Sequence, residues 1–395
     1  MAMEKKYLII NTGSTSKKLA LYESERELCM VHLESEGDGF ISTLSKSGDK
    51  KQKTISKNQF EENIEYVLGE FLSEKIIEDK SEIQMIGLRI VAPGTYFQTN
   101  RVIDDTYKEN LKKAETILPL HITPVLETLK HIGHIFSHIP VVGISDSKFH
   151  KDLPDMAKYY AIPKEDTEKF ELFKYGYHGI SHSSVIEKIK NMYDEIPERV
   201  ILCHIGGGIS ITAVKNGKSI DTTMGFTPLS GAVMATRVGD IDPGAVIYLQ
   251  KRLKMSGEES EQYFNKQSGL LGVSGLSSDL RELLKLEEKG NPFAKRAIDM
   301  FQYRIKKEIG SSIVVLGGVD MIVFSGTIGE RSHILRERIC EGLQGLGIIL
   351  DRQENENIHS TDSEIGKTDS QVKIVVLRTE EMSCIAKETR EIPLV

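Results

Sequence analysis

Two stretches of the same design decide the fold: KYLIINTGSTSKKLAL, residues 6–21, and RVILCHIGGGISITAV, residues 199–214. Each is an apolar run, a loop of small residues and a second apolar run, which predicts two strands joined by a loop. The first loop carries hydroxyls and lysines, whereas the second carries glycines. A tight hairpin needs only about two loop residues. Each of these longer loops is therefore either an ordinary polar turn or a cradle for an anion.

Strand and helix patterns alternate around these hairpins. Residues 40–56 read as strands around a Ser-Gly-Asp turn, and apolar residues then recur at helical spacing over residues 60–72, behind an expected cap at Asn58. A third small-residue loop lies within residues 321–335, between a strand and a helix, where backbone N–H groups and the helix dipole favour anions. Three such loops suggest a nucleotide held in a cleft between two domains.

The rest of the first part of the chain fits a sheet covered by helices. Residues 86–91 and 139–145 read as buried strands, and residues 108–135 as helices broken at Pro119 and Pro124. Strands that alternate with helices in this way predict an α/β protein with a mostly parallel sheet.

Composition limits the classes of function. At 395 residues the chain exceeds the size at which one hydrophobic core stops growing, so two domains are expected. A net charge of −7 gives no electrostatic footprint for nucleic acid. The apolar region 310–326 is interrupted by glycines, so it reads as a helix end, a turn and a buried strand and not as a membrane span. The cysteines lie far apart with no paired spacing, which argues against disulfides or a zinc site and fits a reducing cytoplasm.

Several polar residues stand beside apolar runs and are candidates for chemistry. They are Arg89, Asp146, His150, His178, His182, Arg237, Asp240, Asp242, Glu380 and Glu381. Each also has a structural interpretation: a buried ion pair, a histidine pair on one helix face, a loop cap, or a solvated helix start. A series at His131, His134 and His138 has helical spacing and could bind a metal, but no nearby Cys or carboxylate completes a ligand set.

Taken together, these motifs identify a resemblance. The chain is similar to the acetokinase family, the acetate, propionate and butyrate kinases, within the superfamily of sugar kinases, actin and heat-shock ATPases. The similar motifs, which follow in family order along almost the whole chain, are NTGSTSKK, LRIVAPG, PLH, SDSKFH, YGYHGISH, HIGGGIS, DTTMGFTPLSG, TRVGDIDPG, SGLLGVSGLSSDLR, FSGTIGERS and TEEMSCIAKET. DTTMGFTPL and GDIDPG are the longest and most specific of them.

The resemblance implies reversible transfer of the γ-phosphoryl group of ATP to acetate or propionate, giving an acyl phosphate and ADP, with Mg²⁺ (or Mn²⁺). It implies four catalytic residues, Arg89, Asp146, His178 and Arg237, and two metal-holding residues, Asn11 and Glu380. The guanidinium groups would grip the carboxylate and the phosphoryl group, the imidazole would bond developing charge, and the Asp146 carboxylate would orient the acceptor or the metal shell. Glu381, beside the metal-holding glutamate, is expected to be a solvated neighbour.

The resemblance also implies the binding sites. The implied nucleotide-binding residues are Ser14, Ser16, Lys18, His204, Gly206, Gly207, Gly208, Asp279, Arg281, Gly326, Ile328, Gly329 and Glu330, and the implied acyl pocket is Val91, Leu120, His121, Tyr177 and Pro228. The chain departs from the family pattern at Ala92-Pro93, where His-Gly is usual, and at Tyr177, where Phe is usual. These departures bear on acyl-chain length.

The implied architecture is two actin-like (ribonuclease H-like) domains around a nucleotide cleft. Residues 1–150, completed by about 383–395, would form one domain, and residues 151–382 the other; Arg89 and Arg237 would meet by domain closure. A homodimer is expected by family analogy, with no nucleic acid and no membrane as partner. The alternatives are a kinase for a longer carboxylate such as butyrate, or an inactive nucleotide-binding regulator on the same fold.

Overall fold

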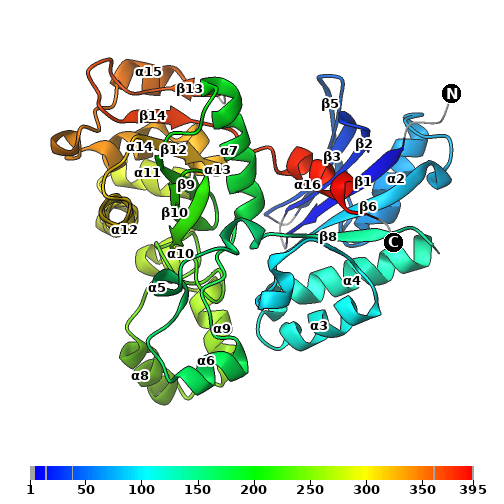
Figure 1. Ribbon diagram of the computed structural model, residues 1–395, viewed down its shortest axis with the longest axis horizontal. Helices are drawn as coiled ribbons and strands as arrows, with labels where there is room; N and C mark the ends of the chain where they lie inside the picture. The colour runs from blue at the N-terminus through cyan, green and yellow to red at the C-terminus, as the bar shows by residue number, and fades with distance from the viewer. Residues whose placement is uncertain (1–4, 14–15, 38, 137, 359–360, 394–395) are drawn as a thin grey trace. The chain divides into compact units, whose positions relative to one another are not determined.

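The structure is a computed structural model that describes residues 5–13, 16–37, 39–136, 138–358 and 361–393. Contacts divide the chain into two compact units (Figure 1). The first unit is Met1–Lys148 with Glu380–Val395, and the second is Phe149–Thr379. Each unit is described by itself below.

The first unit is built on one mixed sheet. Its strands are β1 (Lys6–Thr12), β2 (Ser16–Glu23), β3 (Arg26–Glu36), β4 (Gly39–Lys46), β5 (Asp49–Ile55), β6 (Ile83–Ile90), β7 (Arg101–Val102) and β8 (Val141–Ser145), and its helices are α1 (Lys57–Glu61), α2 (Asn63–Ser73), α3 (Asp105–Glu115), α4 (Pro119–Ile135) and α16 (Glu381–Glu391). The strand order is β5-β4-β3-β2-β1-β6-β8-β7. β1 to β5 form an antiparallel meander, and β1, β6 and β8 are parallel.

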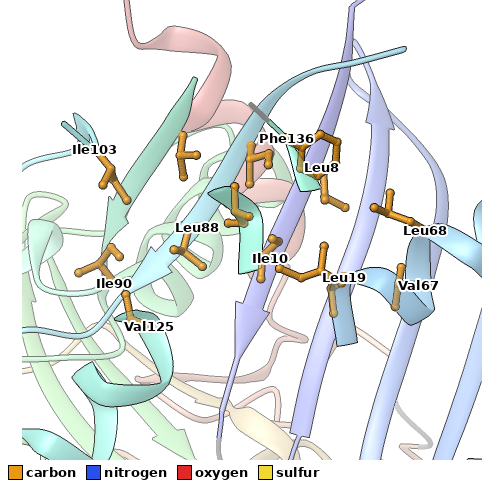
Figure 2. Packing of buried hydrophobic residues seen from close by; sticks show 14 of the residues in the cluster. Leu8, Ile10, Leu19, Val67, Leu68, Leu88, Ile90, Ile103, Val125 and Phe136 are labelled. Carbon is orange, nitrogen blue, oxygen red and sulfur yellow. The ribbon is translucent and has the colours of Figure 1, made fainter. Parts of the chain in front are cut away.

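Alternation along the strands gives this sheet two apolar faces. Leu8 and Ile10 of β1 point to the same face as Leu88 of β6, where side chains of α2 and α4 pack on them (Figure 2). The opposite face carries α16, which contacts β1, β6 and β8. The approach is so close that a Cβ on Gly87 would lie within van der Waals overlap of Thr389 Oγ1 and Ile385. Glycine at position 87 is therefore needed for α16 to pack there.

The second unit repeats the design. Its strands are β9 (Arg199–Ile205), β10 (Ile209–Lys215), β11 (Lys218–Thr222), β12 (Met321–Ser325), β13 (Ser363–Glu364) and β14 (Lys373–Val376). Its helices are α5 (Asp155–Lys158), α6 (Lys164–Phe170), α7 (Gly179–Tyr193), α8 (Pro243–Leu253), α9 (Gly257–Lys266), α10 (Gly269–Ser274), α11 (Leu280–Glu288), α12 (Pro292–Leu316), α13 (Gly326–Arg331), α14 (His333–Cys340) and α15 (Arg352–Asn357). The strand order β11-β10-β9-β12-β14 matches β3-β2-β1-β6-β8, with the same mixture of antiparallel and parallel pairs. The repeat predicted from the two hairpins is present.

Two local predictions were wrong. The first helix after the meander is capped by Ser56, which forms a capping box with Gln59, and not by Asn58. The chain then continues as two helices, α1 and α2. Pro119 does begin a helix, but Pro124 lies inside α4 without ending it. Burial at helical spacing on both sides of Pro124 outweighs the hydrogen bond that it cannot donate.

The structure also bears on the expectations about membrane spans and about the cysteines. Within the part of the chain that the structure describes, no helix has the length and apolar character needed to cross a bilayer. The four cysteines are free thiols, and all of them are buried.

Candidate active site

Arg89 and Asp146 form a bidentate ion pair in the first unit. Arg89 is near the end of β6, and Asp146 directly follows the parallel strand β8; the Asp146 N–H donates to Ile90 O at 2.9 Å, which fixes their register. Arg89 Nε lies 3.1 Å from Asp146 Oδ1, and Nη2 lies 3.0 Å from Oδ2. The arginine side chain is 21% exposed and the aspartate side chain 2%. The planar guanidinium fork is therefore held in one orientation.

The charge state of Arg89 follows from this environment. Burial acts to lower the pKa of Arg89, but the negative charges of Asp146 and Glu381 and the hydrogen bond to Asp146 together raise it above its ordinary value. Arg89 is therefore a permanent cation in a largely buried position.

Asn11, at the end of β1, links this pair to the C-terminal helix. Its Oδ1 accepts from Arg89 Nη1 at 3.2 Å, and its Nδ2 donates to Glu381 Oε2 at 2.9 Å. The resemblance implied that Asn11 holds a metal ion together with Glu380. In the structure, the carboxylate that accepts the hydrogen bond from the Asn11 amide is that of Glu381, in the first turn of α16. Glu380 occupies the N-cap position of α16, where its carbonyl accepts from the Cys384 N–H.

Amide and carboxylate oxygens of this kind are the ligands that a hard divalent cation prefers. Magnesium binds one or two carboxylates and keeps several waters in addition to phosphate oxygens of a substrate, so it needs no closed cage of protein ligands. Among the described residues there is no cluster of three or more His, Cys, Asp or Glu that could hold a metal ion. His131, from the alternative histidine series, contacts Glu65.

The first small-residue loop joins β1 to β2. Ser14 lies outside the described residues. Gly13 N donates to Ser16 O at 2.8 Å, and Ser16 Oγ lies 2.8 Å from His32 Nε2. Lys18 pairs across the hairpin with Asn11 and stands opposite His32 on β3. Burial and the Lys18 charge lower the pKa of His32 to about 4, so Ser16 has a neutral partner at neutral pH.

In the second unit, His178 and Arg237 flank the second loop at Gly208. A Cβ on Gly208 would lie 3.2 Å from Arg237 Nη1 and 3.3 Å from His178 Nε2. His178 adopts φ 60° at the N-cap of α7, and its Nδ1 lies 3.0 Å from Ser210 Oγ on β10. A guanidinium nitrogen and an imidazole nitrogen thus lie close to the same loop glycine, an arrangement that suits an anion when the imidazole nitrogen carries a proton.

Neighbouring contacts hold this group in place. The ring centroid of His204 lies 4.1 Å from that of His178, and His204 Nδ1 lies 2.7 Å from Ser181 Oγ. Arg237 Nη1 donates to Pro228 O at 3.2 Å, and Ala235 N donates to Gly207 O at 3.4 Å. The segment that carries Arg237 is therefore tied to the loop that it faces.

The residues of the implied acyl pocket have different environments. Val91 follows β6, and Leu120 and His121 lie in the first turn of α4; all three are half-buried. Tyr177 is buried, and its hydroxyl donates to Phe226 O at 2.6 Å. Ala92 is 2% exposed and belongs to the hydrophobic core of its unit.

The implied adenosine side contains an ion pair and a tight turn. Asp279 caps α11 and accepts from Arg281 Nη2 at 2.5 Å, and this hydrogen bond keeps the pKa of Asp279 below its usual value. Gly326 begins α13 with φ 76°, where a Cβ would lie 2.9 Å from Ile205 O. Glu330 accepts from Thr379 N at 3.3 Å, and burial raises the pKa of Glu330.

One residue beside this loop was missed by sequence reasoning. Arg336 on α14 is completely buried, and its Nη1 donates to Gly329 O at 2.8 Å and to Glu330 O at 2.9 Å. Its remaining donors reach the side chain and carbonyl of Asn355. Arg336 lies one helical turn before the apolar Cys340, which is buried in the structure, and this spacing was the only hint of burial in the sequence. The sequence did not distinguish Arg336 from the nearby Arg338, whose side chain is 30% exposed.

Known proteins match this chain along almost its whole length. The model of the acetokinase family matches residues 6–387. The acetate kinase of Clostridium botulinum (strain 657 / Type Ba4) is 39% identical over 394 residues, covering 98% of this chain and 99% of the relative. Among solved structures, a propionate kinase from Francisella tularensis has a TM-score of 0.89 at 35% identity, covering 98% of this chain and all of its own.

An acetate kinase from Porphyromonas gingivalis, also solved, has a TM-score of 0.85 at 33% identity and covers 98% of this chain and 99% of its own. These likenesses confirm the predicted α/β class and the family resemblance read from the motifs. The chain belongs to the acetokinase family.

Proposed function

We propose that this protein is an ATP-dependent carboxylate kinase acting on acetate or propionate. A carboxylate oxygen attacks the γ-phosphorus of ATP, the bond from that phosphorus to the β,γ-bridging oxygen breaks, and ADP leaves with that oxygen. The acyl phosphate and ADP react back by the same route. Because a carboxylate is already ionised at neutral pH, the reaction needs no strong general base.

The observation that carries the proposal is the pair of donors at Gly208. Phosphoryl transfer depends mainly on positioning and on neutralising charge. Arg237 Nη1 and His178 Nε2 lie 3.2 Å and 3.3 Å from the position that a Cβ on Gly208 would take. In the proposal they bind the transferring phosphoryl group, and the loop amides at Gly207 and Gly208 bind the phosphates behind it, while the Gly206 N–H donates to Gly208 O at 2.9 Å and closes the loop.

The first unit supplies the groups for the acceptor and the metal. Arg89, held by Asp146, is assigned to the carboxylate, which a planar fork recognises well. Asn11 and Glu380 would hold Mg²⁺ (or Mn²⁺) and its waters, and Glu381 would hold the Asn11 amide in place. When bound, this ion neutralises charge on the phosphate oxygens. Ser16 and Lys18 are assigned to phosphate, and Asp279, Arg281 and the Gly326–Glu330 segment to adenosine.

The names of the relatives support acetate and propionate as the acceptor acids. The Clostridium botulinum relative is an acetate kinase, and the Francisella tularensis structure is a propionate kinase. These names favour acetate and propionate over butyrate. An inactive regulator is not favoured, because the charged side chains expected for catalysis are all present. A homodimer and a cytoplasmic location remain part of the proposal; the free, buried cysteines are compatible with a reducing compartment.

The experiment is to trap the product with hydroxylamine. Purified protein, ATP and Mg²⁺ are incubated with formate, acetate, propionate or butyrate, and the hydroxamate is measured. We expect hydroxamate with acetate and propionate, and a fall in turnover of at least about a hundredfold in Arg237→Ala. Arg352→Ala, which removes an exposed arginine of the same unit, is the matched control. No hydroxamate from the wild-type protein with any of these acids would refute the proposal.

A further inference from the structure

A buried histidine without an assigned role lies one helical turn from His178. His182, on α7, is completely buried, and its ring centroid is 5.6 Å from that of His150 and 6.3 Å from that of His204. Burial, together with the charge that these two neighbours can carry, lowers the pKa of His182 well below its ordinary value. His182 is therefore a neutral imidazole that carries a single proton.

The surroundings of His182 decide which nitrogen carries that proton. Nε2 lies 3.0 Å from Ser210 Oγ and 3.1 Å from Thr212 Oγ1. Nδ1 is buried and has no hydrogen-bond partner among the residues that the structure describes. A buried N–H without an acceptor is rarer than a buried acceptor without a donor, and leaving it unpaired is costly. The proton therefore belongs on Nε2, from which it can be donated to a hydroxyl oxygen.

Ser210 transmits this choice to His178. Its Oγ lies 3.0 Å from His182 Nε2 and also 3.0 Å from His178 Nδ1. A hydroxyl has one proton to donate. Since His182 Nε2 already bears a proton, it cannot accept the Ser210 proton, and of the two imidazole nitrogens beside this hydroxyl only His178 Nδ1 can accept it. A neutral His178 ring that accepts at Nδ1 keeps its own proton on Nε2, which is the nitrogen that faces Gly208.

We propose that His182 and Ser210 are positioning residues that hold His178 as an Nε2–H donor towards the group bound at Gly208. In the other tautomer His178 would present a lone pair to that group and would repel an anion. The benefit for phosphoryl transfer rests on the proposed function, but the tautomer of His178 does not. A fixed tautomer of this kind is worth orders of magnitude in other enzymes that use histidine.

The direct test is nuclear magnetic resonance of the wild-type protein labelled with ¹⁵N-histidine. Two-bond ¹H–¹⁵N correlations distinguish the Nδ1–H, Nε2–H and doubly protonated rings, and the spectra of His178→Gln and His182→Gln assign the two residues. At pH 7.5 we expect both rings to be neutral with the proton on Nε2. A proton on Nδ1 of either ring, or a doubly protonated ring, would overturn the proposal. This measurement requires no turnover, so it separates failure of the relay from failure of the proposed kinase activity.

A variant then tests the relay itself. Ser210→Ala should let His178 exchange between tautomers and should lower kcat about tenfold, with KM for both substrates changed by less than about twofold. Ser210→Thr keeps the hydroxyl and should restore the Nε2–H signature. The control is Ser312→Ala, because Ser312 is a buried serine whose hydroxyl donates within α12, to Glu308 O. An unchanged His178 spectrum and unchanged kcat in Ser210→Ala would show that Ser210 does not relay the tautomer.

Discussion

Adding one methyl group at Gly208 should disturb the two proposed phosphoryl-binding side chains at once. The Cβ of Gly208→Ala would lie 3.2 Å from Arg237 Nη1 and 3.3 Å from His178 Nε2, closer than most side-chain contacts in proteins. The neighbours must therefore move by a few tenths of an ångström. A misplacement of about 1 Å can cost roughly a hundredfold in rate, so a shift of this size should lower kcat about three- to tenfold.

The adjacent glycine provides the matched comparison. A Cβ on Gly207 would meet nothing within 4 Å, and its φ does not lie in the left-handed region. Gly207→Ala changes the same loop by the same group, so its loss should be clearly smaller. Gly310→Ala, in α12, adds a methyl group into open space away from the loop and should leave the rate unchanged.

The assay is steady-state hydroxamate formation with saturating ATP and acetate, with thermal unfolding of each variant as a check on folding. An equal loss in Gly208→Ala and Gly207→Ala would show that the effect comes from the loop backbone and not from Arg237 and His178. A Gly208→Ala protein as active as the wild type would show that the two side chains do not act at Gly208.

Three further predictions concern single residues. Asp146→Asn leaves Arg89 as a largely buried cation without its ion pair, so unfolding in urea should show a loss of about 2–4 kcal/mol. Glu74→Gln, at the exposed pair with Lys51, should cost clearly less, and similar losses in the two variants would refute the buried-pair account. Glu380→Ala should raise the Mg²⁺ concentration needed for half-maximal rate. Glu381→Ala removes the hydrogen-bond acceptor of Asn11 and should lower kcat more than it changes the Mg²⁺ dependence. The reverse pattern in Mg²⁺ titrations of the two variants would exchange the two roles. Arg336→Met leaves the Gly329 and Glu330 carbonyls without their donor. It should therefore raise KM for ATP by about three- to tenfold, with a smaller change in KM for acetate. An unchanged KM for ATP would show that Arg336 does not support nucleotide binding.

Most of the framework could be predicted from the sequence because its signals are local. The stretches 6–21 and 199–214 each hold two apolar runs around a loop, and both form the antiparallel hairpin that this pattern predicted. At Asn216-Gly217 both residues adopt positive φ, which is the geometry that this dipeptide favours in a two-residue hairpin turn. Local chemistry of this kind does not depend on distant parts of the chain.

The errors arose where tertiary packing decides. The helix start at Ser56 and the uninterrupted passage of α4 through Pro124 depend on which residues are buried, and periodicity alone did not reveal this. Glu381 was expected to be a solvated neighbour, but its carboxylate accepts from Asn11, because the first turn of α16 directs it toward β1. The burial of Arg336 depends on Asn355, far away in sequence and unremarkable by itself.

The central claim is that a carboxylate oxygen of the acceptor becomes bonded to the γ-phosphorus of ATP. It can be tested by ³¹P nuclear magnetic resonance of the wild-type protein with ATP, Mg²⁺ and acetate labelled with ¹⁸O in the carboxylate. We predict formation of ADP and an acyl phosphate in equal amounts, with the isotope shift of one ¹⁸O on the acyl-phosphate phosphorus. Formation of ADP with only unlabelled inorganic phosphate, or no loss of ATP, for acetate and likewise for propionate, would contradict the account.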